Sequence, residues 1–391
     1  MTLTRRRLLG GTALLAVAAA CGSPAPAPAP APAAGPIDGP DALVDWIAAH
    51  PEHASVLADD GRGVAFAHLA DRPRPIASSV KVAHLVAYAQ AVEAGRIDPA
   101  GPVAVADWER WYLPGSDGDA HPQALAALGA PVTVTWDDVV ASMIDYSDNA
   151  AADLVLATLG ADALTAAAQA GGWDGLDVPH IVGEGLWVLQ PDPAADRRSR
   201  AAELGRAYAD GDPAARALGA VYGGGPLPGG GGPLPGGGGP LPGGGGPLPG
   251  GGGAVAAPVP EDTWNAVVGL WDGAWAGSAT QLAALHRAVA TDALGPVASG
   301  IARGHLERAV ADRLPPGVLG LGQKGGGLPG ILSHAATIRR DDGTVGVSVL
   351  TLSGLPQQAY QEINASGALL LGQQVLVDDA LRDRLAAALP Q

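Results

Sequence analysis

Residues 331–352 read ILSHAATIRRDDGTVGVSVLTL, in which two apolar stretches, 331–340 and 344–352, flank the turn sequence Asp-Asp-Gly. An Asp-Gly pair between such stretches predicts a β-hairpin, because both residues accept the backbone conformations that tight turns require. A second hairpin is predicted near the other end of the chain, where residues 54–58 and 63–69 flank Asp59-Asp60-Gly61-Arg62-Gly63. Both ends of the chain therefore supply antiparallel strands.

Helical patterns fill most of the sequence between the hairpins. Apolar residues at helical spacing predict a helix over 78–95, which Gly95 ends, and the string Thr135-Trp136-Asp137-Asp138 resembles a capping box at the start of another. A further helix is predicted over 149–159, and a helical tail follows from Gln357. We therefore expect an α+β fold: an antiparallel sheet built from both chain ends with flanking helices, plus an inserted all-helical lobe.

The composition excludes several classes of function. The net charge is −16 over 391 residues, so the chain has no basic surface with which to bind nucleic acid. The single Cys rules out an internal disulfide and a cysteine-rich zinc or redox site, and the nine His show no metal-binding spacing. We expect no metal, no other cofactor and no nucleic-acid partner, and we expect a monomer.

The first 39 residues resemble an export signal followed by a tether. Thr4-Arg5-Arg6-Arg7-Leu8-Leu9 looks like a twin-arginine signal, and the small residues before Cys21 look like a lipoprotein cleavage site. We expect residues 1–20 to be removed and residues 21–39, rich in Pro and Ala, to form an extended tether. The mature protein is then lipid-anchored through Cys21 on the outer face of the cytoplasmic membrane, or secreted if Cys21 is cut away or left unmodified.

Folded sequence begins near Pro40, and residues 40–391 are expected to form one domain. Residues 226–253 interrupt it with four copies of Pro-Leu-Pro-Gly-Gly-Gly-Gly. Such a composition cannot bury a core, so we expect a flexible surface insertion.

Only two of the 23 basic residues are lysines, Lys81 and Lys324. Arg replaces Lys wherever a permanent charge suffices, whereas a desolvated Lys can lose its proton and act as a base. Ser78-Ser79-Val80-Lys81 places a hydroxyl and an amine at i and i+3, on one face of a helix. Lys324 opens the string Lys324-Gly325-Gly326-Gly327, just before the late hairpin.

A third string, Ser147-Asp148-Asn149, lies between two predicted helices and supplies a second hydroxyl and an amide. The three strings, in this order, resemble the serine β-lactamase and penicillin-binding protein superfamily, and most closely the class A β-lactamases. The resemblance covers the chain from about Pro40 to Arg384, apart from the insertion, and implies the same two-lobed fold.

The resemblance also implies a role for each string. Ser78 is the acylated nucleophile, Lys81 activates it, and Ser147 relays a proton to the leaving nitrogen. The substrate-binding residues are those whose amide, cation or backbone holds the substrate: Asn149, Lys324, Gly325, Gly326 and Gly327. The backbone N–H groups of Ser78 and Gly327 form the oxyanion hole, and Asp148 is expected to be structural.

The sequence departs from the family pattern at two points. Gly325 stands where the family usually has Thr or Ser, so a hydroxyl that helps to bind the carboxylate of a penicillin is absent. The family string that contains the deacylating Glu, Glu-x-x-Leu-Asn, is also absent after the second string. By spacing from the second string Glu184 is best placed, and we favour it, although Glu261 fits the family string better through Trp264-Asn265.

The expected function is that of a β-lactamase-like serine hydrolase, which acts through a Ser acyl-enzyme on β-lactam amides and so takes part in the antibiotic response. Two alternatives remain open. One is a penicillin-binding D,D-peptidase that acts on peptidoglycan stem peptides. The other is an envelope lipoprotein that kept the fold as a binding module with a degenerate site. A carboxylate aimed at the Ser78 ester would separate the hydrolase from the peptidase.

Overall fold

A computed structural model describes residues 35–221 and 259–389 of the chain. The expected signal 1–20, Cys21, the tether up to residue 34 and the repeat insertion 226–253 lie outside the described residues.

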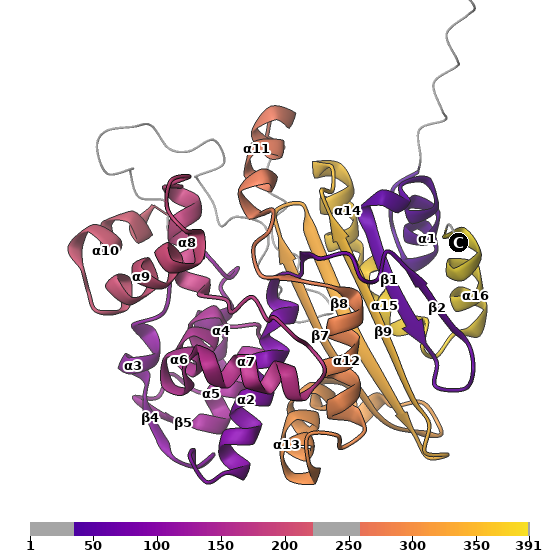
Figure 1. Cartoon of the computed structure of the whole chain (residues 1–391), viewed down its shortest axis with the longest axis horizontal. Coiled ribbons are helices and arrows are strands. Elements are labelled where there is room, and N and C mark those ends of the chain that lie inside the picture. The colour runs from indigo at the N-terminus through magenta and orange to yellow at the C-terminus, as the bar shows by residue number, and fades with distance from the viewer. Residues whose placement is uncertain (1–34, 222–258, 390–391) are drawn as a thin grey trace, which may run out of the picture. The chain divides into compact units, whose positions relative to one another are not determined.

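Five antiparallel strands form the main sheet, in the order β2-β1-β9-β8-β7 (Figure 1). Two strands come from the N-terminal part of the chain, β1 (Ala54–Asp59) and β2 (Ala65–His68). Three come from the C-terminal part: β7 (Val318–Leu328), β8 (Ile331–Arg340) and β9 (Val345–Ser353). β1 pairs with β9, so the sheet is built from both chain ends, as predicted.

The turn between β8 and β9 shows why its sequence specifies a hairpin. Gly343 has a φ of 82°, in the left-handed region that glycine adopts without steric cost. The carboxylate of Asp342 accepts a hydrogen bond from the backbone N–H of Thr344 at 2.9 Å, and the N–H of Arg340 donates to the carbonyl oxygen of Thr344 at 3.0 Å. The turn therefore holds β8 and β9 in a fixed register, which determines the face of the sheet to which each of their side chains points.

Alternate residues of the strands face two different cores. Ile331 and Ala335 of β8 belong to the larger core, which contains α2 (Lys81–Glu93), α12 (Ala279–Ala290) and α13 (Pro296–Glu307). Leu332 of β8 belongs to a second core on the opposite face, with the terminal helices α1 (Pro40–Ala49), α14 (Gln357–Ser366), α15 (Leu371–Gln374) and α16 (Asp379–Ala388). Odd-numbered positions of β8 therefore face the side of the sheet that α2, α12 and α13 cover.

The helical lobe is inserted between the two halves of the sheet (Figure 1). Its helices are α3 (Val105–Glu109), α4 (Ala120–Ala127), α5 (Trp136–Asp145), α6 (Asn149–Leu159), α7 (Ala161–Ala170), α8 (Ile181–Leu189), α9 (Arg197–Ala209) and α10 (Pro213–Ala220). The next helix, α11 (Glu261–Trp271), lies beside the sheet, where its Trp264 packs against Tyr360 of α14. Two short strand pairs accompany these helices, β3 (Arg74–Pro75) with β6 (Ala276–Gly277) and β4 (Pro102–Ala104) with β5 (Thr133–Thr135). The fold predicted from the sequence is confirmed.

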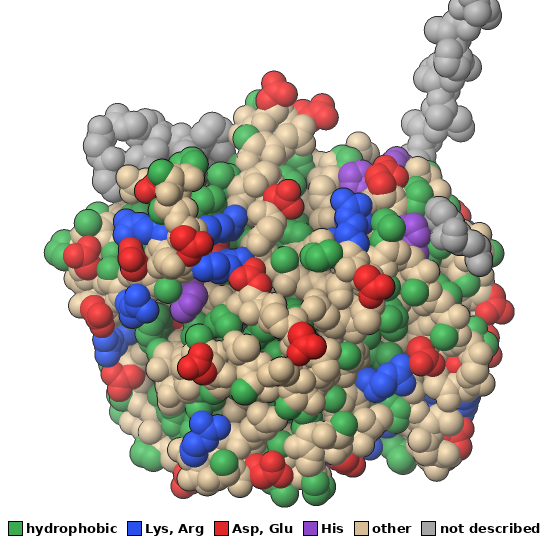
Figure 2. Space-filling model, in the orientation of Figure 1, with side chains coloured by type: hydrophobic (Ala, Val, Ile, Leu, Met, Phe, Trp, Pro, Cys, Tyr) green, Lys and Arg blue, Asp and Glu red, His purple; other side chains and the backbone are tan. Residues whose placement is uncertain are grey.

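The predicted capping box is present at the start of α5. The hydroxyl of Thr135 accepts from the backbone N–H of Asp138 at 3.1 Å, and the Asp138 carboxylate accepts from the N–H of Thr135 at 2.9 Å. This box fixes the start of the helix that leads into Ser147. No single helix within the described ranges is long and apolar enough to cross a membrane, although α6 and α7 together have the required length and composition across a 97° bend. Acidic and basic side chains are interspersed on the face shown in Figure 2.

Candidate active site

Ser78 lies in a short 3₁₀ helix, η2 (Ala77–Val80), which runs directly into α2 at Lys81. The Nζ atom of Lys81 lies 3.1 Å from the Oγ atom of Ser78. Lys81 is fully buried, and Ala77, immediately before Ser78, has a φ of 47°. A non-glycine residue in the left-handed region is strained, and such strain often marks a functional site. The predicted helical spacing thus brings the hydroxyl and the amine together.

Ser147-Asp148-Asn149 forms the tight connection between α5 and α6. Lys81 Nζ donates to the carbonyl oxygen of Ser147 at 2.5 Å and to Oδ1 of Asn149 at 2.7 Å, and lies 3.3 Å from Oγ of Ser147. Ser147 has a φ of 65°, which turns both its carbonyl and its hydroxyl toward Lys81. The Nδ2 group of Asn149 donates to the carbonyl oxygen of Ser116 at 3.3 Å.

Asp148 holds this connection in place. Its Oδ1 atom accepts from the backbone N–H of Ala151 at 3.1 Å and so caps α6, and its Oδ2 atom lies 2.8 Å from Nδ1 of His121. Both side chains are buried, and the His121 ring stacks on Tyr112 with 4.5 Å between centroids. These contacts fix the position of the connection between α5 and α6. His121 was not identified from the sequence, because its partner is 27 residues away.

Lys324 enters the site from the edge strand β7. It pairs with Ala335 in the β7–β8 register, so its side chain faces the side of the sheet that α2, α12 and α13 cover. Its Nζ atom donates to Oγ of Ser147 at 3.0 Å and to the carbonyl oxygen of Gly325 at 3.0 Å. The hydroxyl of Ser147 thus lies between the amines of Lys81 and Lys324, the two lysines of the chain.

Burial changes the basicity of both lysines. Desolvation lowers the pKa of Lys81 to about 8, against the opposing effect of the carboxylates of Asp148, Asp117 and Asp153. Desolvation, with the nearby charge of Lys81, also holds the pKa of Lys324 well below its usual value. Two adjacent buried cations are unfavourable, so one proton is readily lost from the pair.

The surroundings of Lys81 can also accommodate its neutral form, in which it could act as a base. A neutral amine has two N–H donors and one lone pair. The carbonyl of Ser147 and Oδ1 of Asn149 are the two acceptors at hydrogen-bond distance that cannot themselves donate. With both N–H groups used, the lone pair is left for the hydroxyl proton of Ser78.

The glycines after Lys324 let β7 approach Ser78. A Cβ atom at Gly326 would contact the backbone nitrogen of Ser78 and would lie 2.8 Å from the nitrogen of Ser79 and 2.9 Å from the carbonyl oxygen of Ile76. Only glycine fits there without movement of the backbone. At Gly325 a Cβ atom would meet its nearest neighbours at 3.5 Å and 3.6 Å, so the missing side chain is not dictated by space.

Glu184 is fully buried on α8, but its carboxylate contacts other partners. Oε2 accepts from Nε of Arg197 at 2.7 Å, and Oε1 accepts from Nη1 of Arg198. Arg198 also binds Asp177. Neither oxygen of Glu184 contacts Ser78 or Lys81, so the structure does not bring this residue into the lysine network. Glu261 is exposed at the start of α11 and makes no contact with the network either.

Two buried carboxylates near Lys81 were not identified from the sequence. Both oxygens of Asp153 accept backbone N–H groups, from Ile181 at 2.9 Å and Val182 at 2.7 Å, at the start of α8. Asp117 is 2% exposed, and its Oδ1 atom has no partner. Burial and the charge of Asp148 raise the pKa of Asp117 to about 6. No group of three or more metal-binding side chains occurs in the part of the chain that the structure describes.

Residues 41–220 match the model of the beta-lactamase enzyme family, and this match confirms the predicted resemblance to the serine β-lactamase and penicillin-binding protein superfamily. None of the curated proteins matches the sequence. Among solved structures, PBP-A is 15% identical over 85% of this chain and 95% of its own, with a TM-score of 0.44. A β-lactamase from Chitinophaga pinensis is 12% identical over 84% and 96%, with a TM-score of 0.49. A β-lactamase from Sphaerobacter thermophilus is 18% identical over 84% and 95%, with a TM-score of 0.45.

Proposed function

We propose that this chain, whose residues 41–220 match the beta-lactamase enzyme family, is a serine hydrolase that opens β-lactam amides through an acyl-enzyme on Ser78. One observation carries the proposal: Lys81 Nζ lies 3.1 Å from Ser78 Oγ while two other acceptors take its N–H groups. This arrangement leaves a buried lone pair directed at a nucleophilic hydroxyl.

Acylation would follow from the same contacts. Lys81 takes the proton of Ser78, whose Oγ bonds to the carbonyl carbon of the substrate. The backbone N–H groups of Ser78 and Gly327 stabilise the oxyanion. Ser147 then gives its proton to the leaving nitrogen as the C–N bond breaks, and the proton held by Lys81 restores the Ser147 hydroxyl. Lys324 supplies a cation for the substrate carboxylate.

The second candidate function is that of a penicillin-binding D,D-peptidase. The contacts of Glu184 favour it, because a carboxylate bound by two arginines is not free to take a proton from water. In such an enzyme the penicilloyl ester on Ser78 persists, since no base activates the hydrolytic water. The two candidates share the acylation step and differ only in the fate of the ester.

Incubation of the full chain with a fluorescent penicillin, followed over time by intact-mass spectrometry, tests both the acylation of Ser78 and the fate of the resulting ester. A Ser78→Ala variant is the control for labelling at other sites. A transient adduct on the wild type indicates a β-lactamase, and an adduct that persists indicates a penicillin-binding protein. Absence of any adduct on Ser78 would refute the acyl-enzyme proposal and favour a non-catalytic binding module.

Glu184→Gln and Glu261→Gln form a matched pair for the deacylation step. If Glu184 is the base, the first variant accumulates the ester while the second turns over normally. From its arginine contacts we expect instead that Glu184→Gln lowers the melting temperature and leaves the lifetime of the ester unchanged, since the half-buried Arg197 and Arg198 lose the charge of this carboxylate. Accumulation of the ester in Glu184→Gln alone would contradict this expectation.

We also propose that the protein is exported and lipid-anchored through Cys21. The twin-arginine string and the small residues before the single Cys support this proposal. Metabolic labelling with a radioactive fatty acid should mark the wild type and not a Cys21→Ala variant. Equal labelling of both would refute it.

A further inference from the structure

Arg74 is a buried cation without an acidic partner. It is 4% exposed and lies on β3, four residues before Ser78. Its guanidinium donates to the hydroxyl groups of Ser55 at 2.7 Å and Ser353 at 2.6 Å, and to the backbone carbonyls of Glu52 at 2.6 Å and Ala54 at 3.0 Å. It takes part in no ion pair within residues 35–221 and 259–389. These four bonds use four of the five guanidinium N–H groups and leave one on Nη1.

A second arginine adds to this charge. Burial and the neighbouring charge of Arg72 together lower the pKa of Arg74 to about 10, and no carboxylate opposes them. Arg72 is exposed, and its side chain makes no hydrogen bond or ion pair with the described part of the chain. A bound anion would lower the electrostatic cost of this arrangement, most of all at the buried guanidinium of Arg74.

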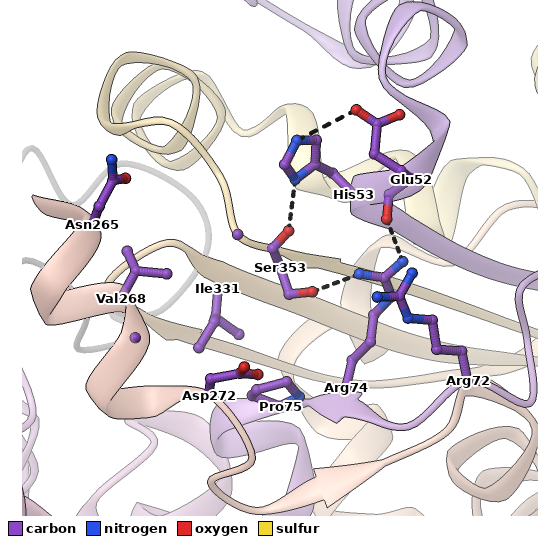
Figure 3. Close-up of a pocket in the computed structure, with 12 residues that line it drawn as sticks. Glu52, His53, Arg72, Arg74, Pro75, Asn265, Val268, Asp272, Ile331 and Ser353 are labelled. Atoms are coloured by element: carbon purple, nitrogen blue, oxygen red, sulfur yellow. Dashed lines mark hydrogen bonds and ion pairs between the residues drawn. The ribbon is translucent and has the colours of Figure 1, made fainter. Parts of the chain in front are cut away.

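Both arginines line a pocket of about 410 Å³, shown in Figure 3. The hydroxyl group of Ser353 also lines it, beside the Arg74 guanidinium. Apolar side chains complete the wall: Ile331 of β8, which is buried, Pro75 of β3, and Val268 of α11. The pocket therefore has a cationic side and an apolar side, as small-molecule sites commonly do.

The acidic residues of the pocket do not neutralise the arginines. The Glu52 carboxylate lies 3.6 Å from Nε2 of His53, and Glu52 meets Arg74 only through its backbone carbonyl. Asp272 is exposed and forms no ion pair with either arginine. The pocket also lies apart from the serine–lysine network, because the hydrogen bonds that Lys81 and Lys324 make within the described ranges involve none of the residues that line it.

We propose that this pocket is a second binding site, in which Arg72 and the free N–H of Arg74 hold the carboxylate or phosphate group of a small ligand. The apolar part of the ligand lies over Val268 and Ile331. Guanidinium groups bind planar or tetrahedral oxyanions through paired hydrogen bonds, which matches the donors available here.

Isothermal titration calorimetry of the full chain with butyrate and with inorganic phosphate, at constant ionic strength, tests the site. Arg72→Ala should weaken binding about tenfold or more, because it removes an exposed cation that makes no other contact. Arg96→Ala is the matched control, since Arg96 is also exposed and its side chain has no described partner. Val268→Asp should abolish binding by placing a carboxylate opposite the anion.

Neither Arg72→Ala nor Val268→Asp touches the serine–lysine network, so labelling of Ser78 by a fluorescent penicillin shows that each variant is folded. Preference for butyrate indicates a carboxylate ligand, and preference for phosphate a phosphorylated one. Absence of binding by both anions, or equal binding by Arg72→Ala and Arg96→Ala, would overturn the proposal.

Discussion

Replacement of Lys81 by Arg tests whether this residue acts as a base or only as a cation. The substitution keeps the positive charge but removes the ability to lose a proton. With a pKa of about 8, roughly one Lys81 side chain in ten is neutral at pH 7. A guanidinium is intrinsically more basic than an amine by about two to three pKa units, and burial at this site would lower the pKa of both groups. The acylation rate of Lys81→Arg should therefore fall by about 10²-fold or more.

The rate of adduct formation on Ser78, measured by rapid quenching and intact-mass spectrometry, gives this number directly. Circular dichroism checks that the variant is folded, because a guanidinium is larger than the buried amine it replaces. Lys324→Arg is the matched control: a fixed cation suffices there, so the variant should mainly raise the penicillin concentration needed for half-maximal acylation. Acylation of Lys81→Arg near the wild-type rate, or equal loss in both variants, would refute the base assignment.

The pH dependence of the wild type supplies a second check on the same residue. A base must be deprotonated to act, so the acylation rate should rise with pH and level off above the pKa of Lys81, at about 8. A residue that acted only as a cation would give the opposite trend, with acylation lost as the pH rises through that value.

Two further variants follow from the packing around the site. Gly326→Ala should lower both the acylation rate and the melting temperature, because the added Cβ atom would meet the backbone of Ser78, whereas Gly325→Ala should be tolerated. Thermal unfolding and the rate of penicillin labelling distinguish the two variants. Equal behaviour of the two would contradict the close approach of β7 to Ser78. Asp117→Asn removes a carboxylate that favours the charged form of Lys81, so the pKa of Lys81 should fall and the acid limb of the acylation profile should move to lower pH. A limb that stays in place or moves to higher pH would show that Asp117 does not act on Lys81.

The sequence by itself determined the two hairpins of the sheet and the central pair of the site, because these depend on neighbours close along the chain. Two turn sequences between apolar stretches specified the hairpins, and the register of β8 and β9 followed from the turn at Gly343. Ser78 and Lys81 lie three residues apart at the start of a helix, so their contact needs only helical geometry.

Only the tertiary structure decided the surroundings of the other charged residues, because their partners come from distant segments. The spacing of Glu184 from Ser147 suggested a catalytic base, but α9 places Arg197 and Arg198 against its carboxylate. Nothing in the sequence around Asp117 distinguishes it from an exposed loop residue. It becomes a buried carboxylate near Lys81 only when α4 and α6 pack together.

The pocket at Arg74 could not be predicted either. Its wall is formed by residues near 52, 72–75, 265–272, 331 and 353. These segments are far apart along the chain, and no sequence pattern predicts that they meet. Whether a buried charge is neutralised depends on which side chains the folded chain brings within a few ångströms, and that is a property of the packing rather than of any local pattern.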